Sequence, residues 1–457
     1  MANKIRIGEV VNLSQGFAVN SKSKHLMSES GLPLLRITDL ISGNYSQYLK
    51  EETAPEKCIA SKDELIFTRT GQVGLVFRGK VGVVHNNCFK VIPNRDFIEP
   101  DYLYWFLKQP HIVKLANDIA SGSVQKDLNH SAFKSIEIAL LPLKQQRQNT
   151  KVLNRIEERI EQNKQTNQTL EEMAQALFKS WFVDFDPVID NALAAGNAIP
   201  DQLQHRVEIR KKAHALQKQN PNIKPLHEAT QRLFPSEFEH CCDNTLGIQG
   251  WIPKGWEYSE LAEFIGVKHG YAYKGEYFCN EPTDDVLLTP GNVAIGGGFK
   301  GDKFKFYNGP VMDNYIFNEG DLFITMTDLS KAGDALGYPA IVPYVAGLTF
   351  HHNQRLGKVE FKDRIKFGTE FIYRCLCSRE YRSSIVATAT GTTVKHTSPT
   401  KILKHKVINS RGVIEPIFEF YIKNFTAKKE LNNINSRHLA VTRDYLLPKL
   451  ISGEVTI

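Results

Sequence analysis

The sequence predicts an α+β protein: two tandem mixed α/β domains separated by two long antiparallel coiled-coil helices. Three observations lead to this fold class. Short sequence patterns in the first half recur in the same order in the second half. Within each copy, apolar residues alternate as they do in strands, and each copy is followed by a long polar segment with a helical apolar stripe. The length, 457 residues, is also too great for one compact core.

The internal repeat carries most of the prediction. A Gly-aromatic-Ala pattern at 16–18 recurs at 270–272, and a Gly followed four positions later by Lys occurs at Gly122 and again at Gly391. Four matches keep the same order along the chain: 16–19 with 270–273, 34–39 with 287–292, 64–70 with 321–327, and 121–126 with 390–395. Chance explains any one of these matches, but an ordered series indicates duplication.

Each copy of the repeat is predicted to contain a mixed sheet. Residues 65–70 and 79–92 are rich in alternating Val, Ile, Phe and Tyr, interrupted by Gly and Asn that are typical of turns.

The two segments that follow the repeats are predicted to be long helices. Both begin after a proline, Pro142 and Pro416, as helices commonly do. The first apolar stripe consists of Leu153, Ile156, Ile160, Asn163, Asn167, Leu170, Ala174, Leu177 and Trp181. The second consists of Ile417, Phe420, Asn424, Ala427, Leu431, Ile434, His438, Val441 and Tyr445.

An apolar stripe of this length requires a partner, and the matching stripe of the same chain is the simplest one. Because each helix leaves a globular copy, antiparallel pairing is expected, with Asn163, Asn167, Asn424 and His438 fixing the register at some cost in stability. The alternative is a pair of independent amphipathic helices, each packed on its own domain.

The predicted organisation has five parts. Residues 1–142 form the first domain, 143–185 the first helix, 186–250 a helical linker, 251–413 the second domain, and 414–457 the second helix with a tail. The charged run at 206–212 in the linker is expected to be a solvated face.

The composition narrows the class of protein. A net charge of +7 favours an anionic partner, since clustered Lys and Arg gain affinity by releasing counterions from phosphates. The seven cysteines, with Cys241 next to Cys242, are too irregular for a disulfide framework or a zinc site, so free thiols are expected. The N-terminus has no signal-peptide core, and no run of eighteen apolar residues occurs, so a soluble cytoplasmic protein without a membrane partner is expected.

Three motifs imitate catalytic or binding sites. Residues 74–80 read GxxxxGK, but Val81 stands where a magnesium-binding Ser or Thr is required. Residues 296–301 read GxGxxG, but strand-like alternation follows instead of a helix. His351 and His352 are adjacent and would point to opposite faces of a strand, which disfavours a shared metal. The sequence therefore predicts no catalytic centre, no metal site and no cofactor in this chain.

Together these features resemble one family, the specificity subunits of type I restriction-modification systems. The resemblance is carried by the Gly-aromatic-Ala pairs, residues 34–39 and 121–128, the helix entry at 141–146 and its exit at 177–185, and the stretches 232–235 and 251–256. It covers nearly the whole chain. The entry to the second helix departs from the family pattern, since residues 409–412 read NSRG where a Pro-Pro-Leu type sequence is usual.

The resemblance implies a function. The two domains would be target-recognition domains, each reading one half of a bipartite target in double-stranded DNA. Two DNA adenine methyltransferase subunits would dock on the helical spacer and supply S-adenosylmethionine, and translocating endonuclease subunits would join them. This chain would be non-catalytic.

Polar residues near the family's DNA-facing positions are the candidate reading residues, since base edges are recognised by Arg, Lys, Gln, Asn and hydroxyl side chains. In the first domain these are Arg36, Thr38, Asp39, Arg69, Thr70, Gln72, Gln125 and Lys126. In the second they are Asn292, Thr325, Thr327, His352, Asn353, Gln354 and Lys395. Two other classes stay open: a coiled-coil interaction scaffold without DNA specificity, and a degenerate DNA-modifying enzyme.

Overall fold

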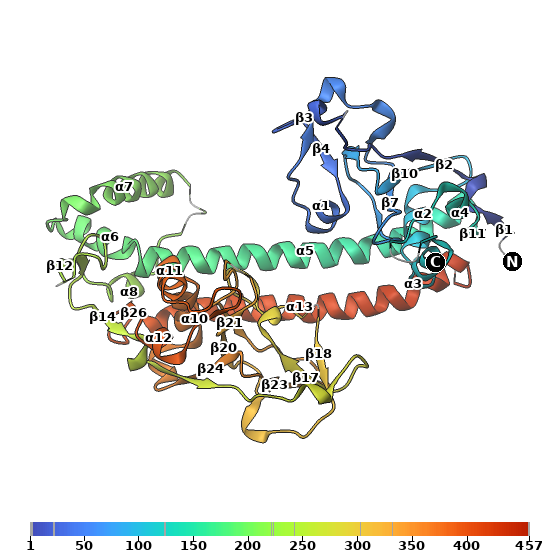
Figure 1. The fold of residues 1–457 in the computed structure, drawn as a ribbon. Coiled ribbons are helices and arrows are strands. Elements are labelled where there is room, and N and C mark those ends of the chain that lie inside the picture. Colours follow the sequence, from blue (N-terminus) through green and yellow to red (C-terminus); the bar gives the residue numbers. More distant parts are fainter. Residues whose placement is uncertain are drawn as a thin grey trace. The chain divides into compact units, whose positions relative to one another are not determined.

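The computed structural model describes residues 3–21, 23–122, 125–220, 222, 224–241, 243–301, 303–330 and 332–455. Ser123 and Val124 of the repeated stretch, and Cys242, lie outside these residues. The chain forms two compact units: the first comprises Met1–Thr166 and Glu430–Ile457, the second Asn167–Lys429. Both long helices, α5 (Leu143–Phe182) and α13 (Glu415–Ser452), contribute to both units (Figure 1).

The first unit contains two main sheets. The four-stranded sheet has the order β2 (Val11–Gln15), β10 (Cys88–Pro93), β7 (Leu65–Thr68) and β8 (Val76–Phe77). The five-stranded sheet has the order β3 (Met27–Ser28), β5 (Tyr48–Leu49), β4 (Leu32–Leu35), β9 (Gly82–Val84) and β6 (Ile59–Ala60). Its β4–β9 pair is parallel while its other pairs are antiparallel, so the sheet is mixed.

The second unit repeats this topology strand for strand. Its four-stranded sheet has the order β15 (Ile265–His269), β24 (Leu356–Phe361), β20 (Leu322–Thr325) and β22 (Pro339–Ile341). Its five-stranded sheet has the order β16 (Phe278–Cys279), β18 (Lys305–Tyr307), β17 (Asp285–Leu288), β23 (Thr349–His352) and β19 (Ile316–Phe317), again with one parallel pair, β17–β23. The internal repeat predicted from the sequence is therefore confirmed.

The end of each repeat is also alike. Helices α2 (Pro100–Leu107), α3 (Pro110–Ile119) and α4 (His130–Lys134) precede β11 (Glu137–Leu140), which pairs with β1 (Asn3–Arg6). Helices α10 (Thr369–Cys377), α11 (Arg379–Ala387) and α12 (Pro399–Leu403) precede β26 (Lys406–Asn409), which pairs with β14 (Glu257–Glu260). A long helix follows β11 and β26 in each case.

The NSRG sequence at 409–412 forms a closed turn before α13. The Glu415 carboxylate, fully buried, accepts hydrogen bonds from the backbone N–H of Ser410 at 2.7 Å and from its hydroxyl at 2.5 Å. Arg411 adopts a positive φ of 59° within this turn. The helix therefore begins at Glu415, and Pro416 is its second residue and does not precede it as expected.

Antiparallel helix pairing is confirmed within each unit. In the first unit Asn149 donates to the Leu450 carbonyl at 2.6 Å, whereas Asn163, further along α5, donates to the Ser436 hydroxyl at 3.1 Å. In the second unit Asn167 donates to the Lys429 carbonyl at 3.3 Å and Trp181 packs on Phe418. Residue numbers rise along one helix as they fall along the other. Asn163 and Asn167 therefore bond across the pair, as predicted for register-fixing residues.

The predicted stripe on α5 is correct, because all nine of its members are buried or half-buried. The predicted stripe on α13 is wrong. Phe420, Leu431, Val441 and Tyr445 are 68%, 49%, 70% and 64% exposed, and Asn424 and His438 are exposed as well. The buried row contains Ile414, Phe418, Ile422, Asn432, Leu447 and Leu450.

The error has a physical cause. At 3.6 residues per turn, the buried row lies on nearly the opposite face of α13 from the predicted row. Polar side chains on this face bond to α5: the Ser436 hydroxyl accepts from Asn163 at 3.1 Å, and Arg443 pairs with Glu157 at 2.6 Å. Hydrophobic periodicity selects the more apolar face, and here that face is the accessible one.

The linker region forms a packed helical hairpin in the second unit. Its elements are α6 (Asp186–Ala195), α7 (Gln204–Gln219), α8 (Glu228–Gln231) and β12 (Phe238–His240), which pairs with β13 (Trp251–Pro253).

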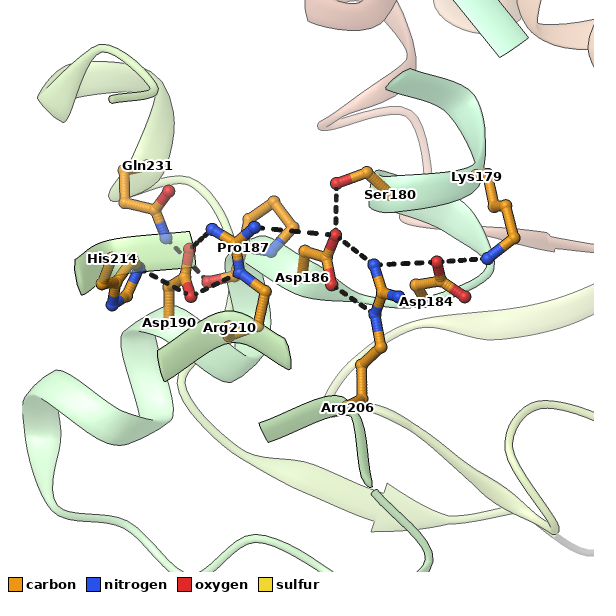
Figure 2. A network of polar contacts seen from close by, with 10 residues as sticks. All are labelled: Lys179, Ser180, Asp184, Asp186, Pro187, Asp190, Arg206, Arg210, His214 and Gln231. Atoms are coloured by element: carbon orange, nitrogen blue, oxygen red, sulfur yellow. Dashed lines mark hydrogen bonds and ion pairs between the residues drawn. The ribbon is translucent and has the colours of Figure 1, made fainter. Parts of the chain in front are cut away.

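The arginines of the charged run at 206–212 are half-buried, whereas a fully solvated face was expected. Figure 2 shows them pointing from α7 toward carboxylates around the start of α6. Arg206 grips Asp186 through two hydrogen bonds of 2.8 Å, and Arg210 pairs with Asp190. Ser180 of α5 donates to the same Asp186 at 2.8 Å. These pairs hold the hairpin against the end of α5, whereas Lys211 and Lys212 are exposed.

Candidate nucleic-acid interface

A tight turn between β9 and β10 organises the loops of the first unit. Phe17 donates to the Val84 carbonyl at 2.6 Å, and Asn86 donates back to the Phe17 carbonyl at 2.9 Å. A Cβ atom at Gly16 would lie 2.3 Å from the His85 carbonyl oxygen. Only glycine permits this approach, so the Gly-aromatic-Ala pattern marks the place where two loops are joined.

The second unit builds the same junction. Tyr271 donates to the His352 carbonyl and Gln354 donates back to the Tyr271 carbonyl, both at 2.9 Å. A Cβ atom at Gly270 would lie 2.1 Å from the Asn353 carbonyl oxygen. The two glycines matched by sequence are therefore equivalent in the fold.

The loops after β7 and β20 extend both junctions. Arg69 donates its backbone N–H to the Asn87 carbonyl at 2.8 Å, and Met326 donates to the Arg355 carbonyl at 2.9 Å. Each unit has one further loop of this kind. In the first unit Ser121 and Asp127 exchange two backbone hydrogen bonds, and in the second unit Thr390 and His396 do the same. We call these loops the first loop face (residues 16–17, 36–39, 69–72, 85–87 and 125–127) and the second loop face (residues 270–271, 326–329, 352–355 and 394–396).

An ion pair forms part of the first loop face. The Arg69 guanidinium donates to Asp127 at 2.5 Å and to the Gln15 amide oxygen at 3.0 Å. Thr70 donates to the other Asp127 oxygen at 2.6 Å. Burial alone would raise the pKa of Asp127, but the hydrogen bonds from Thr70 and Arg69 and the charge of Arg69 outweigh it, so the pKa is lowered. Asp127 thus holds Arg69 in one orientation as a carboxylate.

Arg36 is held in a similar way. Its guanidinium forms a two-point contact with Asp39, at 2.7 and 2.9 Å, and also donates to Ser46 at 2.6 Å. Asp39 is buried, so it orients Arg36 and is not itself accessible to a ligand. Burial lowers the pKa of nearby His85, and the charge of Arg36 lowers it further. His85 therefore stays neutral at physiological pH.

The other predicted residues of the first unit are accessible. Thr38, Gln72, Gln125 and Lys126 are exposed, and Thr70 is half-buried. Lys126 donates to the Asn117 carbonyl at 2.8 Å. All eight residues predicted for this domain lie within the ranges that define the first loop face, and all but the buried Asp39 have accessible surface.

Four predicted residues of the second unit are buried. Asn292 donates to the carbonyls of Lys300 and Lys303, and Thr325 donates to the Ala335 carbonyl. Thr327 bonds to His396, and His352 bonds to the Leu356 carbonyl at 2.9 Å. Burial lowers the pKa of His352 to about 4, so this ring is neutral at physiological pH. These side chains shape the loops from beneath, and we propose no base contact for them.

The remaining predicted residues of the second unit are accessible. Gln354 is exposed, and Asn353 and Lys395 are half-buried. Sequence reasoning missed Gln15 and Asp127 in the first unit and Arg355 in the second. Asp127 directly follows Lys126 in the repeated stretch and Arg355 directly follows Gln354, so proximity to a repeated motif was the available signal.

The three imitating motifs are structural where they are described. Residues 74–80 contain β8 and a turn, and the glycines at 296–298 lie in a turn in which the backbone N–H of Ala294 donates to the Gly298 carbonyl at 2.9 Å. His351 bonds to Asp285 at 2.7 Å, whereas His352 packs on Phe317 on the other side of β23. Among the described residues, no three His, Cys, Asp or Glu side chains gather as metal ligands. In the same part of the chain, every helix is too short or too polar to span a bilayer.

The duplicated loop faces, each on its own pair of sheets and followed by a long helix, define the class of protein. Residues 2–172 match the family described as type I restriction modification DNA specificity domain. Over these residues the chain matches that family model, and the resemblance found in the sequence is confirmed.

Relatives of the same kind match most of the chain. The HindI specificity subunit of Haemophilus influenzae is 25% identical over 401 residues, which are 82% of this chain and 81% of that protein. The MjaIX specificity subunit of Methanocaldococcus jannaschii is 25% identical over 428 residues, 89% of this chain and 81% of that protein. The crystal structure of the S subunit from M. genitalium shares the fold, with a TM-score of 0.52, 14% identity, and coverage of 98% and 96%.

Proposed function

We propose that this chain is the DNA-reading subunit of a type I restriction-modification complex and that each loop face reads one half of a bipartite DNA target. The observation that carries the proposal is the duplication: the same junction, built on the same sheet topology, occurs once in each unit. Two equal readers on one chain suit a target with two separated halves. The net charge of +7 suits a phosphate backbone.

Rigidly held side chains support base reading at these loops. Arg69 is fixed by Asp127 and Gln15, and its side chain is 20% exposed. An oriented guanidinium can contact guanine O6 and N7 with two hydrogen bonds, while Gln72 and Gln125 can contact adenine. Affinity would come from phosphate contacts and specificity from these side chains.

The first prediction concerns the two halves of the target. Arg69→Gln is expected to weaken binding at one position of one half-site by about 1–3 kcal/mol, because one two-point contact is lost. Electrophoretic shift with the reconstituted complex, using duplexes altered in one half at a time, measures this. Arg364→Gln, in the second unit, is the control. A loss spread equally over both halves would contradict the assignment.

The second prediction concerns spacing. We propose that the paired helices set the distance between the half-sites. Inserting one heptad in α5 after Thr166 and one in α13 after Lys429 keeps the cross-helix bonds of Asn163 and Asn167 on either side. Each helix gains about 10 Å, so the gap in the methylated motif is expected to grow by roughly three base pairs. Sequencing of methylated host DNA reads the gap directly, and an unchanged gap would exclude a rigid spacer.

The third prediction concerns partners. We propose that DNA adenine methyltransferase subunits dock on the paired helices and supply S-adenosylmethionine, and that endonuclease subunits join them. The exposed apolar residues of α13 in the first unit, Leu431, Val441 and Tyr445, are suited to such a contact. Val441→Glu is expected to weaken co-purification of the methyltransferase tenfold or more, since a charge would be buried at the interface. Asn435→Glu, an exposed position on the same helix, is the control, and equal effects of both would contradict this docking face.

A scaffold without DNA specificity, or an enzyme with a degenerate site, would behave differently. The purified chain is expected to be inert on DNA alone and to confer sequence-selective binding once the methyltransferase is added. Equal affinity of the complex for all duplexes would favour the scaffold. Methylation or cleavage by the isolated chain would favour the enzyme.

A further inference from the structure

One pair of positions recurs at the centre of both loop faces. In the first unit the backbone N–H of Arg69 donates to the Asn87 carbonyl at 2.8 Å. In the second unit the backbone N–H of Met326 donates to the Arg355 carbonyl at 2.9 Å. In both units the first member follows the equivalent strand, β7 or β20, and the second lies in the equivalent turn before β10 or β24. Each pair contains one arginine, but in the first unit it is the donor, Arg69, and in the second unit it is the acceptor, Arg355.

The two units also differ in the neighbouring loop. The position of Asp127, which holds Arg69, is taken by His396 in the second unit. Thr70 bonds to Asp127 at 2.6 Å, and Thr327 bonds to His396 at 3.2 Å. Without a carboxylate, an arginine at position 326 would have no ion-pair partner there. The residue present is Met326, which is 2% exposed and packs into the core of the second unit.

Arg355 is placed to act as a reader. It is exposed, and within the described residues no carboxylate forms an ion pair with it. Burial lowers the pKa of Lys305, and the charge of Arg355 lowers it further, so the two cations lie near enough to repel each other. A surface with two unneutralised cations attracts an anionic or electron-rich ligand.

The backbone beneath Arg355 is fixed. Its own N–H donates to the Asn353 side chain at 3.0 Å, and its carbonyl accepts from Met326. The same turn is bonded to Tyr271 through His352 and Gln354. A side chain on such a turn loses less conformational entropy on binding than one on a mobile loop.

We propose that Arg355 is a specificity-determining residue of the second half-site and contacts the major-groove edge of a guanine, the role that the proposed function gives to Arg69 in the first. The inference rests on the proposed function. The guanidinium fork matches guanine O6 and N7, which no other base presents together. The two units would thus read their half-sites from different positions of one loop scaffold.

The test uses the full chain assembled with its methyltransferase. The probe is a duplex carrying the motif that the wild-type complex methylates, with each guanine of the second half replaced in turn by 7-deazaguanine, which lacks the N7 acceptor. The wild type is expected to lose affinity about fivefold or more at one guanine. Arg355→Ala should bind the normal duplex about 5- to 150-fold more weakly and show no further loss at that guanine.

Arg355→Lys separates base reading from phosphate binding, because lysine keeps the charge but not the fork. It should lose discrimination at the same guanine, whereas Arg379→Ala, an exposed arginine of the same unit, should behave as wild type. Retained discrimination in the lysine variant, with a uniform loss and a smaller salt slope in the alanine variant, would assign Arg355 to a phosphate and overturn the inference.

The remaining outcomes are distinct. A flat 7-deazaguanine scan by a wild-type complex that still prefers its motif would overturn the inference alone. A wild-type complex that binds scrambled and specific duplexes equally would overturn the proposed function and the inference with it.

Discussion

Replacing Arg374 with methionine is expected to destabilise the second unit by about 3 kcal/mol or more. The Arg374 side chain is 3% exposed and pairs with Glu171 of α5 and with Glu370 at 3.2 Å. Lys429 of α13 reaches the same Glu171 at 2.5 Å. Removing Arg374 leaves Glu370 without its ion-pair partner and Glu171 with Lys429 alone, in a place where water cannot replace the guanidinium.

Urea unfolding followed by tryptophan fluorescence measures this loss, because Trp181 and Trp256 belong to the same core. Arg379→Met, at an exposed position on the next helix, is the matched control and should change stability by less than about 0.5 kcal/mol. A loss below about 1 kcal/mol for Arg374→Met would show that the cluster is not needed. Replacing Arg374, Glu171 and Glu370 together by apolar residues should recover much of the lost stability.

The same cluster predicts the response to acid. Burial opposes ionisation of Glu171, but the hydrogen bond and charge of Arg374, together with Lys429, lower its pKa to about 2 from the ordinary 4.5. A carboxyl group with a lowered folded-state pKa stabilises the fold above its unfolded pKa and loses that contribution as the pH falls through the folded value. The window is therefore about pH 4.5 to 2, with up to about 3 kcal/mol at stake.

The wild type should lose more stability than Glu171→Gln as the pH falls through this window. Glu419 acts in the opposite direction, since burial and then Glu370 raise its pKa, but it is present in both proteins and largely cancels in the difference. If the wild type and Glu171→Gln lost stability equally as the pH fell, the lowered pKa of Glu171 would be contradicted.

Gly270→Ala is expected to abolish reading of the second half-site while leaving the first intact. The new Cβ would lie 2.1 Å from the Asn353 carbonyl oxygen, so the turn that carries Gln354 and Arg355 must move. The backbone bonds between Tyr271 and this turn would be lost with it. Gly16→Ala should have the reciprocal effect through the His85 carbonyl at 2.3 Å. The local cost is about 1–3 kcal/mol, and the loss of affinity for the affected half should exceed tenfold.

Binding of the reconstituted complex to duplexes altered in one half distinguishes the two variants. Gly275→Ala is the matched control, because its Cβ would meet nothing closer than 3.8 Å and it lies shortly after Gly270. Thermal unfolding of each chain separates a local effect from general unfolding. Equal loss at both halves in either variant would contradict independent reading.

The candidate site was predicted in part. The residues selected for the first domain lie in or beside loops that the repeated motifs mark, and their contact with DNA stays a prediction. Asp39, Asn292, Thr325 and His352 were selected for their polarity, yet they are buried and bond to backbone or to neighbouring side chains. Polar residue types serve equally as ligands for DNA and as supports beneath a loop, and sequence alone does not distinguish the two.

The sequence by itself determined the duplication, the mixed sheets, the two long helices and the correct face of α5. These follow from local periodicity and repeated motifs, which are properties of neighbouring residues. Only the tertiary structure decided which face of α13 is buried, because Ser436 and Arg443 become favourable there through side-chain bonds to Asn163 and Glu157, which are distant in the sequence. It also showed that Met326 and Arg355 occupy the positions equivalent to Arg69 and Asn87, since that equivalence depends on backbone bonds between loops that no local pattern records.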